Sequence, residues 1–592
     1  MQGMRFALGT AFGCALLWAA CDRLPDAHPP PDGHPGHDAG APPDLEPPQG
    51  VGTVLVNALD DDTGLPLPAR VLVTAVPPTP SVRFDVDERG RPVNGEFGVR
   101  LSPGVIGAPE GVLLVSGSGW FDVPAGTYDL FITRGPEWEA DERRVGVVKD
   151  HSIRIDSPLR RTVDTSGWLA ADLHVHTARS FDSRIPVEDR VVSEVAVGVE
   201  VIVATDHNVF SDLQPDVDLF GYHALARAFV GDEFNFWEGH GGAYPMPYDA
   251  KDPVDAWGHP TGGAVAWSVE YSLARLIHAG PMFDLLHGLP TAPAVTINHP
   301  RLLPDLGYFT NVGWAPPDPL PTAGSFDAIE ILNGYMDAPD EIATLLRDWF
   351  FLLSSGVRVT GLGSSDTHRL RDVKAGFPRT WLRMPTEDVT KLLPADLADA
   401  IKHQRAIASN GPFARLTVDG AAIGDLVTDT SGIVTVDAFV DAPDWIDVDR
   451  VRLYVNGQVA QEIPLERGLR PRLHLRFRQA LPAGDAWLAL AASGSKPLPT
   501  ALIGEHEGGV VTPFAITSPV FVDGDGDGAW RPRVAEPDPG PIAPQSFSLR
   551  PSWPDGSHLP GAWPPRRMLG DEPAPMDCEP PLWMDPANWA NP

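Results

Sequence analysis

The sequence predicts a central α/β region with a β-rich region on each side. Between residues 167 and 415, short apolar runs rich in β-branched residues alternate with longer helix-like stretches, which is typical of βα units in a parallel sheet or barrel. Residues 51–165 and 416–522 instead show strand-like runs separated by turn signals. Gly (58) and Pro (64) make up about a fifth of the 592 residues, which favours β-rich regions over helical bundles.

The charge and the cysteine content exclude several classes of protein. The chain has 45 Lys and Arg against 79 Asp and Glu, a net charge of −34. Such an acidic chain is not expected to bind nucleic acid or anionic lipid directly. Its three cysteines, Cys14, Cys21 and Cys578, are too few for a disulfide scaffold or a thiolate metal cluster.

Residues 1–20 have the features of a signal peptide. The apolar run 6–20 follows Arg5 and is too short to cross a bilayer, where about 20 residues are needed. It ends in WAAC at Cys21, which resembles a bacterial lipoprotein cleavage site. We therefore expect an exported, periplasmic or cell-surface protein, acylated at Cys21 and attached to a membrane only by that lipid. Ordinary signal cleavage nearby and a disulfide between Cys21 and Cys578 are the alternatives.

A tether and a β-rich region follow. Residues 21–50 are rich in Pro, Asp and Gly and predict an extended, disordered linker. In residues 51–165, the apolar runs 53–56 and 69–73 flank a turn at 60–64, which predicts a β-sandwich. The region resembles the carboxypeptidase-regulatory-like modules of exported proteins, which implies a spacer or binding role.

A second β-rich region is expected over residues 416–532. Val451, Leu453 and Val455 alternate with polar residues and lead into the hairpin turn Asn456-Gly457. The remaining residues, 533–592, are rich in Pro and Trp and predict a tail with little regular structure.

This region ends in three alternate aspartates, Asp523, Asp525 and Asp527. Carboxylates at this spacing are typical of the start of a calcium loop, but the twelfth position holds Val534 instead of Glu. A bound calcium ion and a solvated acidic turn are both compatible with the sequence.

The predicted strands of residues 166–415 each end in polar or ligating residues. The first ends in the HxH pair His174 and His176, and the others end at His207, Glu233, His299, Asn333 and the pair Asp366 and His368. In a parallel α/β barrel, the active site is built at this end of the strands.

The residue types favour a metal site. Residues two apart on a strand point to the same face, so His174 and His176 could share one ion. Imidazole and carboxylate ligands without thiolate suit zinc, manganese or iron. Each histidine taken singly could be an ordinary core or surface residue, whereas the ordered set favours a metal cluster.

These motifs, in order, resemble the polymerase-and-histidinol-phosphatase (PHP) superfamily of metal-dependent phosphoesterases. The motifs are DLHVHTARSFDS, VATDHN, GDE, GH, NHPR, EILNG and GSSDTH, and they are most similar to the exported CehA/McbA-type branch. The resemblance covers about 250 residues. It implies that residues 166–415 form a distorted (β/α)7 barrel, similar to a TIM barrel, with two to three clustered transition-metal ions.

The resemblance also implies nine metal ligands in three groups. The first group is His174, His176, Glu233 and Asp366; the second is Glu233, His240 and His299; and the third is Asp182, His207 and His368. His259 is an alternative to His240, and Ser183 follows Asp182 where many relatives have glycine. We expect Asp206 to orient a neighbouring histidine instead of binding metal.

Clustered divalent ions imply a hydrolase in which a metal-bridging hydroxide attacks an ester, with Glu233 and Asp366 as catalytic ligands. Arg301, Arg369 and Arg379 lie near the ligand-bearing segments and could bind a phosphate through their guanidinium groups. Arg301 directly follows His299-Pro300 and is expected to be catalytic, although each arginine could instead form a surface or interdomain ion pair.

The expected function is therefore that of an exported phosphoesterase acting on a small-molecule or surface-polymer ester. A hydrolase of carboxylic esters, carbamates or amides on the same metal site is one alternative. A non-catalytic surface binding protein with a structural metal is another, although such a site needs four ligands and this chain offers about twice as many.

Overall fold

The computed structural model describes residues 50–84, 100–248, 277–302, 306–370, 375–466, 472–503, 510–531 and 538–540. The chain divides into two units, and all of these residues belong to the second, residues 47–592. Within the described ranges, strands far outnumber helices and form five sheets.

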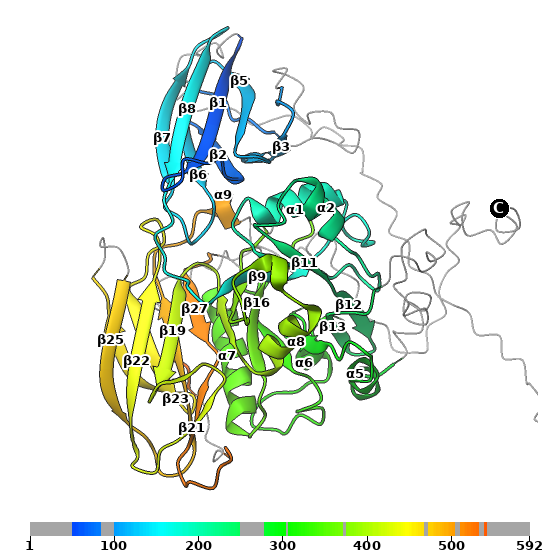
Figure 1. Ribbon diagram of the computed structural model, residues 1–592, viewed down its shortest axis with the longest axis vertical. Helices are drawn as coiled ribbons and strands as arrows, with labels where there is room; N and C mark the ends of the chain where they lie inside the picture. The colour runs from blue at the N-terminus through cyan, green and yellow to red at the C-terminus, as the bar shows by residue number, and fades with distance from the viewer. Residues whose placement is uncertain are drawn as a thin grey trace, which may run out of the picture. The chain divides into compact units, whose positions relative to one another are not determined.

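Residues 51–159 form two sheets around one apolar core, coloured blue to cyan in Figure 1. In β1, every second residue is buried, as expected for a strand with one face on a core. One sheet has the order β5-β1-β8 and the other β3-β4-β2-β6-β7. The strands are β1 (Val51–Asp60), β2 (Ala69–Ala75), β3 (Val105–Ala108), β4 (Gly111–Leu114), β5 (Ser118–Pro124), β6 (Gly126–Thr133), β7 (Asp141–Val147) and β8 (Ser152–Leu159).

Among the described residues, the central segment contains ten strands and most of the helices. Its strands are β9 (Leu169–Val175), β10 (Val201–Ala204), β11 (Arg227–Val230), β12 (Asp232–Phe236), β13 (Gly239–Tyr244), β14 (Ala294–Ile297), β15 (Ala328–Asn333), β16 (Thr360–Ser364), β17 (Arg379–Leu382) and β18 (Ala406–Ser409). Its helices are α1 (Val187–Val195), α2 (Gln214–Leu219), α5 (Ala279–His287), α6 (Tyr308–Asn311), α7 (Pro339–Ser354), α8 (Pro394–Lys402) and the short 3₁₀ helix η1 (Val389–Lys391).

The C-terminal segment is almost entirely β. Its elements are β19 (Phe413–Val418), β20 (Ala421–Ala422), β21 (Leu426–Thr428), β22 (Ile433–Asp441), β23 (Arg450–Val455), β24 (Gln458–Pro464), β25 (Arg472–Ala480), β26 (Ala486–Ser493), α9 (Thr500–Ile503), β27 (Phe514–Thr517) and β28 (Val520–Asp523). Figure 1 shows β19, β22 and β25 side by side in yellow, and they belong to a sheet of order β20-β19-β22-β25. The predicted hairpin at Asn456-Gly457 joins β23 to β24.

The prediction of an α/β barrel is wrong, because the described residues form a β-rich, multi-sheet fold. The central strands are divided between two sheets, β12-β13-β14-β15-β16 and an 11-stranded sheet that starts β11-β10-β9-β17-β18. The second sheet continues through the pair β18–β27 into β26, β23 and β24. Several neighbours, including β17 with β9 and β12 with β13, are antiparallel. A parallel barrel contains no such pairs.

The two central sheets nevertheless face each other through a shared apolar cluster. Leu169, Ala171 and Leu173 of β9 pack in one cluster with Ala328 of β15 and Leu362 of β16. Single parallel bridges also join Val175 to Thr367 and His207 to Glu233, at the ends of strands from different sheets. The polar residues at these strand ends are therefore brought together.

Candidate metal centre

All nine predicted ligands lie in one cluster at these strand ends. His174 and His176 come from β9 and its end, His207 follows β10, Glu233 lies in β12, His240 in β13, His299 after β14, Asp366 and His368 after β16, and Asp182 in the loop after β9. Most of their side chains are almost fully buried. The exceptions are Asp182, which is 29% exposed, and His368, which is 15% exposed. The cluster therefore opens to solvent on the side of Asp182 and His368.

Two of the ligand-bearing turns have unusual backbone conformations. His299 has a φ of 29° and Asp366 a φ of 54°, both in the left-handed region that non-glycine residues rarely adopt. A conformation of this kind costs about 1–3 kcal/mol and is typical of functional sites. Here it accompanies the side-chain contacts that both residues make within the cluster, to Glu233 and to the HxH pair.

Four donor atoms converge in the first predicted group. His174 Nε2 lies 3.0 Å from His176 Nε2, 3.0 Å from Glu233 Oε2 and 3.2 Å from Asp366 Oδ1. His176 Nε2 lies 3.1 Å from Glu233 Oε2 and 3.4 Å from Asp366 Oδ1. A tetrahedral zinc site with bonds of about 2.0 Å has donor–donor distances of about 3.3 Å. The observed separations of 3.0–3.4 Å match that geometry.

Hydrogen bonding alone does not explain this convergence. Within the described residues, Asp366 Oδ1 is buried and accepts no hydrogen bond of good geometry. A buried carboxylate oxygen without a partner is costly, and so is a pair of imidazole nitrogens facing each other at 3.0 Å. A cation at the centre would satisfy all four donors, so this group is suited to hold a metal ion.

Glu233 is shared between the groups. Its Oε2 atom, besides contacting the HxH pair, lies 3.2 Å from His207 Nε2. Its Oε1 atom lies 3.2 Å from His240 Nδ1 and 3.1 Å from His299 Nε2. Glu233, His207 and His240 form a second set of converging donors, which differs from the predicted second group by including His207. His299 is in contact with Glu233 but does not converge with that set. His259 lies outside the described residues.

The third set is the one nearest to solvent. Asp182 Oδ2 lies 3.1 Å from both His207 Nε2 and His368 Nε2. His176 joins them through its contact with Asp182, so the set consists of the predicted third group and one histidine of the first. Three groups of His, Asp and Glu donors thus could each hold a metal ion.

The electrostatics of the cluster are dominated by close contacts between carboxylates and imidazoles. Burial opposes charge on Glu233, but His174 and His207 outweigh it and hold the pKa of Glu233 well below its usual value. Burial likewise opposes a charge on His176, yet the nearby carboxylates of Asp366 and Glu233 raise the pKa of His176 to about 10. Burial lowers the pKa of His240 to about 4. The carboxylates therefore need positive charge beside them, which bound cations can supply.

Residues without a predicted role hold the ligands in place. Asn298 Nδ2 donates to Glu233 Oε1 at 3.1 Å, and Glu330 Oε1 lies 2.9 Å from His174 Nδ1. Arg190 is fully buried in α1 and donates to the carbonyls of His176 and Thr367, each at 3.0 Å. Glu330 belongs to the EILNG motif and Asn298 to the NHPR motif, so the motifs pointed to both positions. Arg190 belongs to none of the motifs, and the sequence analysis did not identify it.

Asp206 does not orient a histidine as expected. Its carboxylate accepts hydrogen bonds from Thr177 N at 2.6 Å, from Thr177 Oγ1 at 2.7 Å and from Ser211 Oγ. Asp206 therefore fixes the chain just beyond the HxH pair.

Two of the predicted substrate-binding arginines are engaged elsewhere. Arg301 donates to both carboxylate oxygens of Asp348, at 2.7 and 3.0 Å, and to the carbonyl of Trp314. Arg379 is 1% exposed and donates to the carbonyls of Gly376 and Val197. Both guanidinium groups thus bind partners within the fold, and a role of Arg301 and Arg379 in substrate binding stays a prediction.

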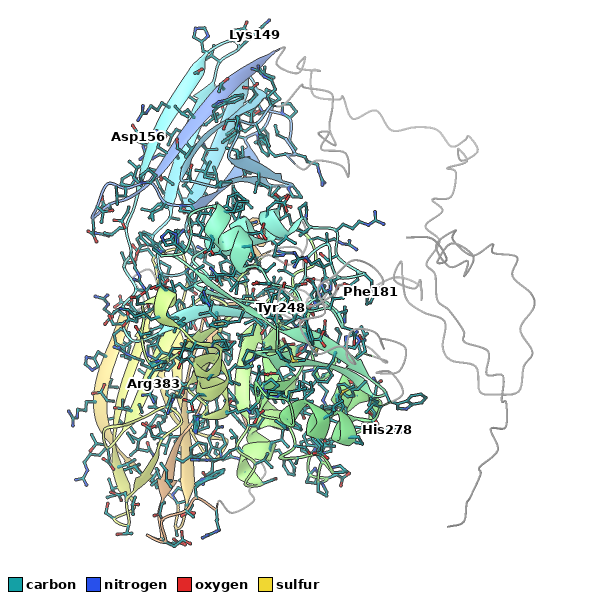
Figure 2. The ribbon with its side chains drawn as sticks, turned by 45° about the vertical axis from the view of Figure 1, so that its right-hand side comes forward. Lys149, Asp156, Phe181, Tyr248, His278 and Arg383 are labelled. Atoms are coloured by element: carbon teal, nitrogen blue, oxygen red, sulfur yellow. The ribbon has the colours of Figure 1, made fainter. Side chains whose placement is uncertain are left out.

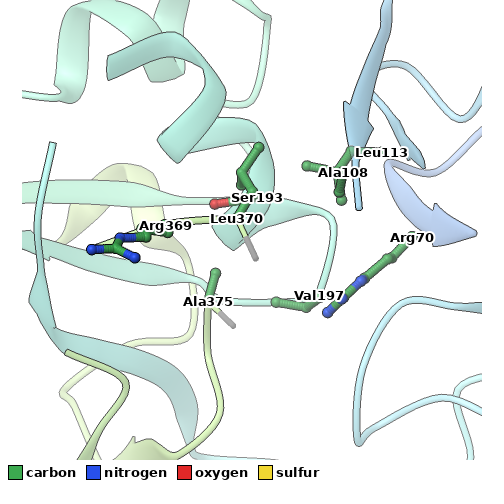
Figure 3. A pocket seen from close by; sticks show the side chains of 8 residues that line it. All are labelled: Arg70, Ala108, Leu113, Ser193, Val197, Arg369, Leu370 and Ala375. Atoms are coloured by element: carbon green, nitrogen blue, oxygen red, sulfur yellow. The ribbon is translucent and has the colours of Figure 1, made fainter. Parts of the chain in front are cut away.

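Arg369 has a different environment. It is exposed, directly follows the ligand His368, and lines a small pocket together with Arg70, Ser193 and Leu370. Figure 3 shows the guanidinium of Arg369 directed away from Arg70.

Two aromatic residues border the open side of the cluster. Phe181, labelled in Figure 2, is 68% exposed and stacks on the ring of the ligand His207 with centroids 4.9 Å apart. The hydroxyl of Tyr335 lies 3.5 Å from His368 Nδ1. A molecule that reaches the metal groups from solvent would meet both side chains.

The aspartates of the predicted calcium loop are arranged differently from the expectation. Asp523 and Asp525 converge with Asp485, which the sequence did not suggest, whereas Asp527 pairs with Arg531. Asp523 accepts hydrogen bonds from Gly528 N at 2.9 Å and Gly526 N at 2.7 Å.

The described residues do not include the predicted signal segment, nearly all of the predicted linker and tail, or the cysteines Cys14, Cys21 and Cys578. Among the helices that the structure does describe, none is both long and apolar enough to cross a membrane.

Comparisons with known proteins add little. No protein-family model matches the chain, and no curated protein matches it. A crystal structure of endonuclease Q with a 27-mer duplex substrate carrying an abasic lesion is similar at 11% identity and a TM-score of 0.26, over 40% of this chain. The chain covers 56% of that protein, little more than half. An FMN-binding beta-glucuronidase from Facaelibacterium prausnitzii L2-6 is similar at 9% identity and a TM-score of 0.16, over 81% of this chain and 89% of its own. Neither likeness is close enough to support an argument about fold or function.

Proposed function

We propose that the protein is an exported, metal-dependent hydrolase that cleaves an ester, with a phosphoester as the favoured substrate. The observation that supports this proposal is the sharing of donors between sets. Glu233 and His207 belong to two sets each, so ions in these sets would lie next to one another. A purely structural metal site closes one ion with four ligands, whereas adjacent ions with shared ligands are typical of hydrolases.

The donors favour two to three transition-metal ions. All are imidazole nitrogens or carboxylate oxygens, which suit zinc, manganese or iron. The first set offers four donors from buried residues at tetrahedral spacing. The set with Asp182 and His368 is partly exposed, and this exposure leaves room for water or substrate beside an ion.

The ions, when bound, would polarise an ester oxygen and lower the pKa of a water molecule. The chain's own residues would then arrange the reactants. Glu233 and Asp366 hold the Nε2 atoms of His176 and His174 in place. Asp182 and His368 lie on the partly exposed side, from which substrate would enter. Phe181 and Tyr335 border that entry, and Arg369 follows His368 directly. Arg369 is therefore the arginine that we propose for binding a phosphate group.

The proposal includes the location of the protein. The apolar run 6–20 and Cys21 support export and a lipid anchor, which would place the hydrolase in the periplasm or at the cell surface. Mass spectrometry of the mature N-terminus tests this part: a diacylglycerol-modified Cys21 is expected, and an unmodified N-terminus at another residue would contradict it.

Turnover tests the chemistry. Purified protein is incubated with zinc, manganese or iron(II) and assayed on a nitrophenyl phosphodiester, a nitrophenyl phosphomonoester and an aryl carbamate. We expect metal-dependent release from a phosphoester, reduced about 100-fold or more in His176→Ala and Asp366→Ala, because loss of an outer-shell partner already costs 10–100-fold. Asp485→Asn, which removes a converging carboxylate outside the site, serves as the matched control and should keep full activity. Release from the carbamate alone would contradict the phosphoester, and undiminished activity in both alanine variants would contradict the site.

A further inference from the structure

Glu330 is a buried carboxylate that contacts two residues of the donor cluster, His174 and His299. Its side chain is 2% exposed, and it does not belong to any of the converging donor sets found in the described residues. It lies in β15, whereas the ligands it contacts come from β9 and from the loop after β14. Glu330 thus touches ligands carried by both central sheets.

One carboxylate oxygen of Glu330 sets the state of His174. Glu330 Oε1 lies 2.9 Å from His174 Nδ1, while His174 Nε2 faces the other three donors of the first set. An imidazole that donates its Nδ1 proton to a carboxylate keeps the lone pair on Nε2 for a metal. The contact therefore selects the tautomer that can bind an ion and holds the ring in its orientation.

The second carboxylate oxygen of Glu330, Oε2, holds residues that contact Glu233 and Asp366. Glu330 Oε2 accepts a hydrogen bond from the backbone N–H of His299 at 2.7 Å and one from Asn333 Nδ2 at 2.8 Å. His299 is the residue with a φ of 29°, and its ring contacts Glu233 Oε1. Asn333 Nδ2 also lies 3.2 Å from Asp366 Oδ2. The backbone of one ligand and the carboxylate of another are thus both fixed through the same oxygen.

We propose that Glu330 is a positioning residue that couples ion binding in the first set, His174, His176, Glu233 and Asp366, to the placement of His299 beside Glu233. The proposal rests on the metal binding in the proposed function. It predicts that ion binding in the first set weakens when Glu330 is altered, and that binding in the set of Glu233, His207 and His240 weakens with it because the two sets share Glu233. The set containing Asp182 and His368 should keep its affinity, because Glu330 does not contact either residue.

The variant Glu330→Gln tests this coupling with almost no change of volume. A carboxylate accepts hydrogen bonds with both oxygens, whereas an amide has one acceptor oxygen and one donor nitrogen. The single oxygen of glutamine can therefore accept a hydrogen bond either from His174 or from His299 and Asn333. The amide nitrogen then cannot accept the hydrogen bonds on the other side. We expect the zinc affinity of the sites flanking Glu233, measured by chelator competition, to fall about 10–100-fold.

Asp327 provides a matched control next to the same strand. Its Oδ2 atom lies 2.9 Å from His287 Nε2 and accepts a hydrogen bond from the backbone N–H of Val295 at 2.9 Å. It thus pairs with one imidazole and one backbone amide, as Glu330 does, but it does not contact a predicted ligand. Asp327→Asn should leave every zinc affinity unchanged, even where the ion-free protein becomes less stable.

The outcomes separate this inference from the proposed function. Wild-type protein that takes up no zinc contradicts the metal site itself. Wild-type protein that binds zinc while Glu330→Gln binds it equally well overturns the role of Glu330 alone. A loss in Asp327→Asn equal to that in Glu330→Gln also overturns it, because the effect would then be structural. If Glu330→Gln does not fold, Asn333→Ala decides: it should weaken the first set, which contains Asp366, and unchanged affinity there overturns the coupling.

Discussion

Within the described residues, carboxylates converge in two places, and the two places differ in which groups bind the carboxylate oxygens. In the central cluster, Asp366 Oδ1 and Glu233 Oε2 face imidazole nitrogens at 3.0–3.4 Å. In the C-terminal loop, Asp485 and Asp523 accept hydrogen bonds from backbone N–H groups, including Gly524 to Asp485 at 2.9 Å and Gly526 to Asp523 at 2.7 Å.

This difference shows why proximity of acidic groups is a poor indicator of a metal site. Hydrogen bonds from backbone amides stabilise the ionised carboxylates of the loop without a bound cation. The loop is therefore stable as an Asx-type turn. The central donors have few such partners, and several imidazole lone pairs converge with them. A cation could bind the converging donors of the central cluster, whereas Asp523 of the C-terminal loop already has backbone N–H partners.

We expect the largest effect on metal binding from substitution of Glu233, the carboxylate shared within the central cluster. Glu233 contacts donors of every set, whereas His368 converges in one. Glu233→Gln should therefore lower the zinc affinity of at least two sites by about 100-fold or more, because a direct ligand contributes more than an outer-shell partner. His368→Ala should weaken one site. Stepwise zinc titration of both variants checks this, and equal losses in the two would break the account of Glu233 as the shared ligand.

The smallest effect is expected at the C-terminal loop. Burial opposes charge on Asp523, but hydrogen bonds from Gly528 N and Thr428 Oγ1 outweigh it and lower the pKa of Asp523. A lowered pKa means that the ionised carboxylate stabilises the fold above the unfolded value of about 3.9, and that this stabilisation is lost as the pH falls through the folded pKa.

Asp523→Asn should accordingly lower the melting temperature at pH 7 by less than about 2 °C, because one weak interaction shifts the melting temperature less as the folding unit becomes larger. The difference from wild type should shrink as the pH falls below about 3.9 and should vanish only below the folded pKa of Asp523, where the carboxylate is protonated in both states. Thermal melts with and without calcium measure both points. If calcium raised the melting temperature of the wild-type protein by several degrees, the C-terminal loop would also be a cation site, and the contrast with the central cluster would be wrong.

The two histidine-containing pairs could be predicted because their chemistry is local, whereas Asp182 and His240 entered the predicted ligand set only through the resemblance to the PHP superfamily. The pair His174 and His176 shares a strand face by the two-residue period, and Asp366 and His368 repeat that spacing at the end of another strand. Contacts between segments far apart in the chain were not predictable in the same way. The sequence places Arg301 beside a ligand, yet its guanidinium pairs with Asp348 on α7, 47 residues later.

The fold class was not predictable for a related reason. Alternating apolar and helix-like stretches show where strands occur, but they do not show which strands pair or in which direction. The antiparallel pairs of β17 with β9 and of β18 with β27 depend on residues separated by about 100 to 200 positions. The strand ends could meet as expected even though the sheets differ, because one apolar cluster packs β9, β15 and β16 together.

Metal content tests the central claim most directly. Elemental analysis of the purified protein, after loading with zinc, manganese or iron(II) and removal of excess ion, gives the number of ions per chain. We predict two to three equivalents in the wild type, and a loss of at least one in the double variant His174→Ala/His176→Ala at unchanged circular dichroism. A wild-type chain that is folded and retains none of these ions under any loading condition would contradict the account.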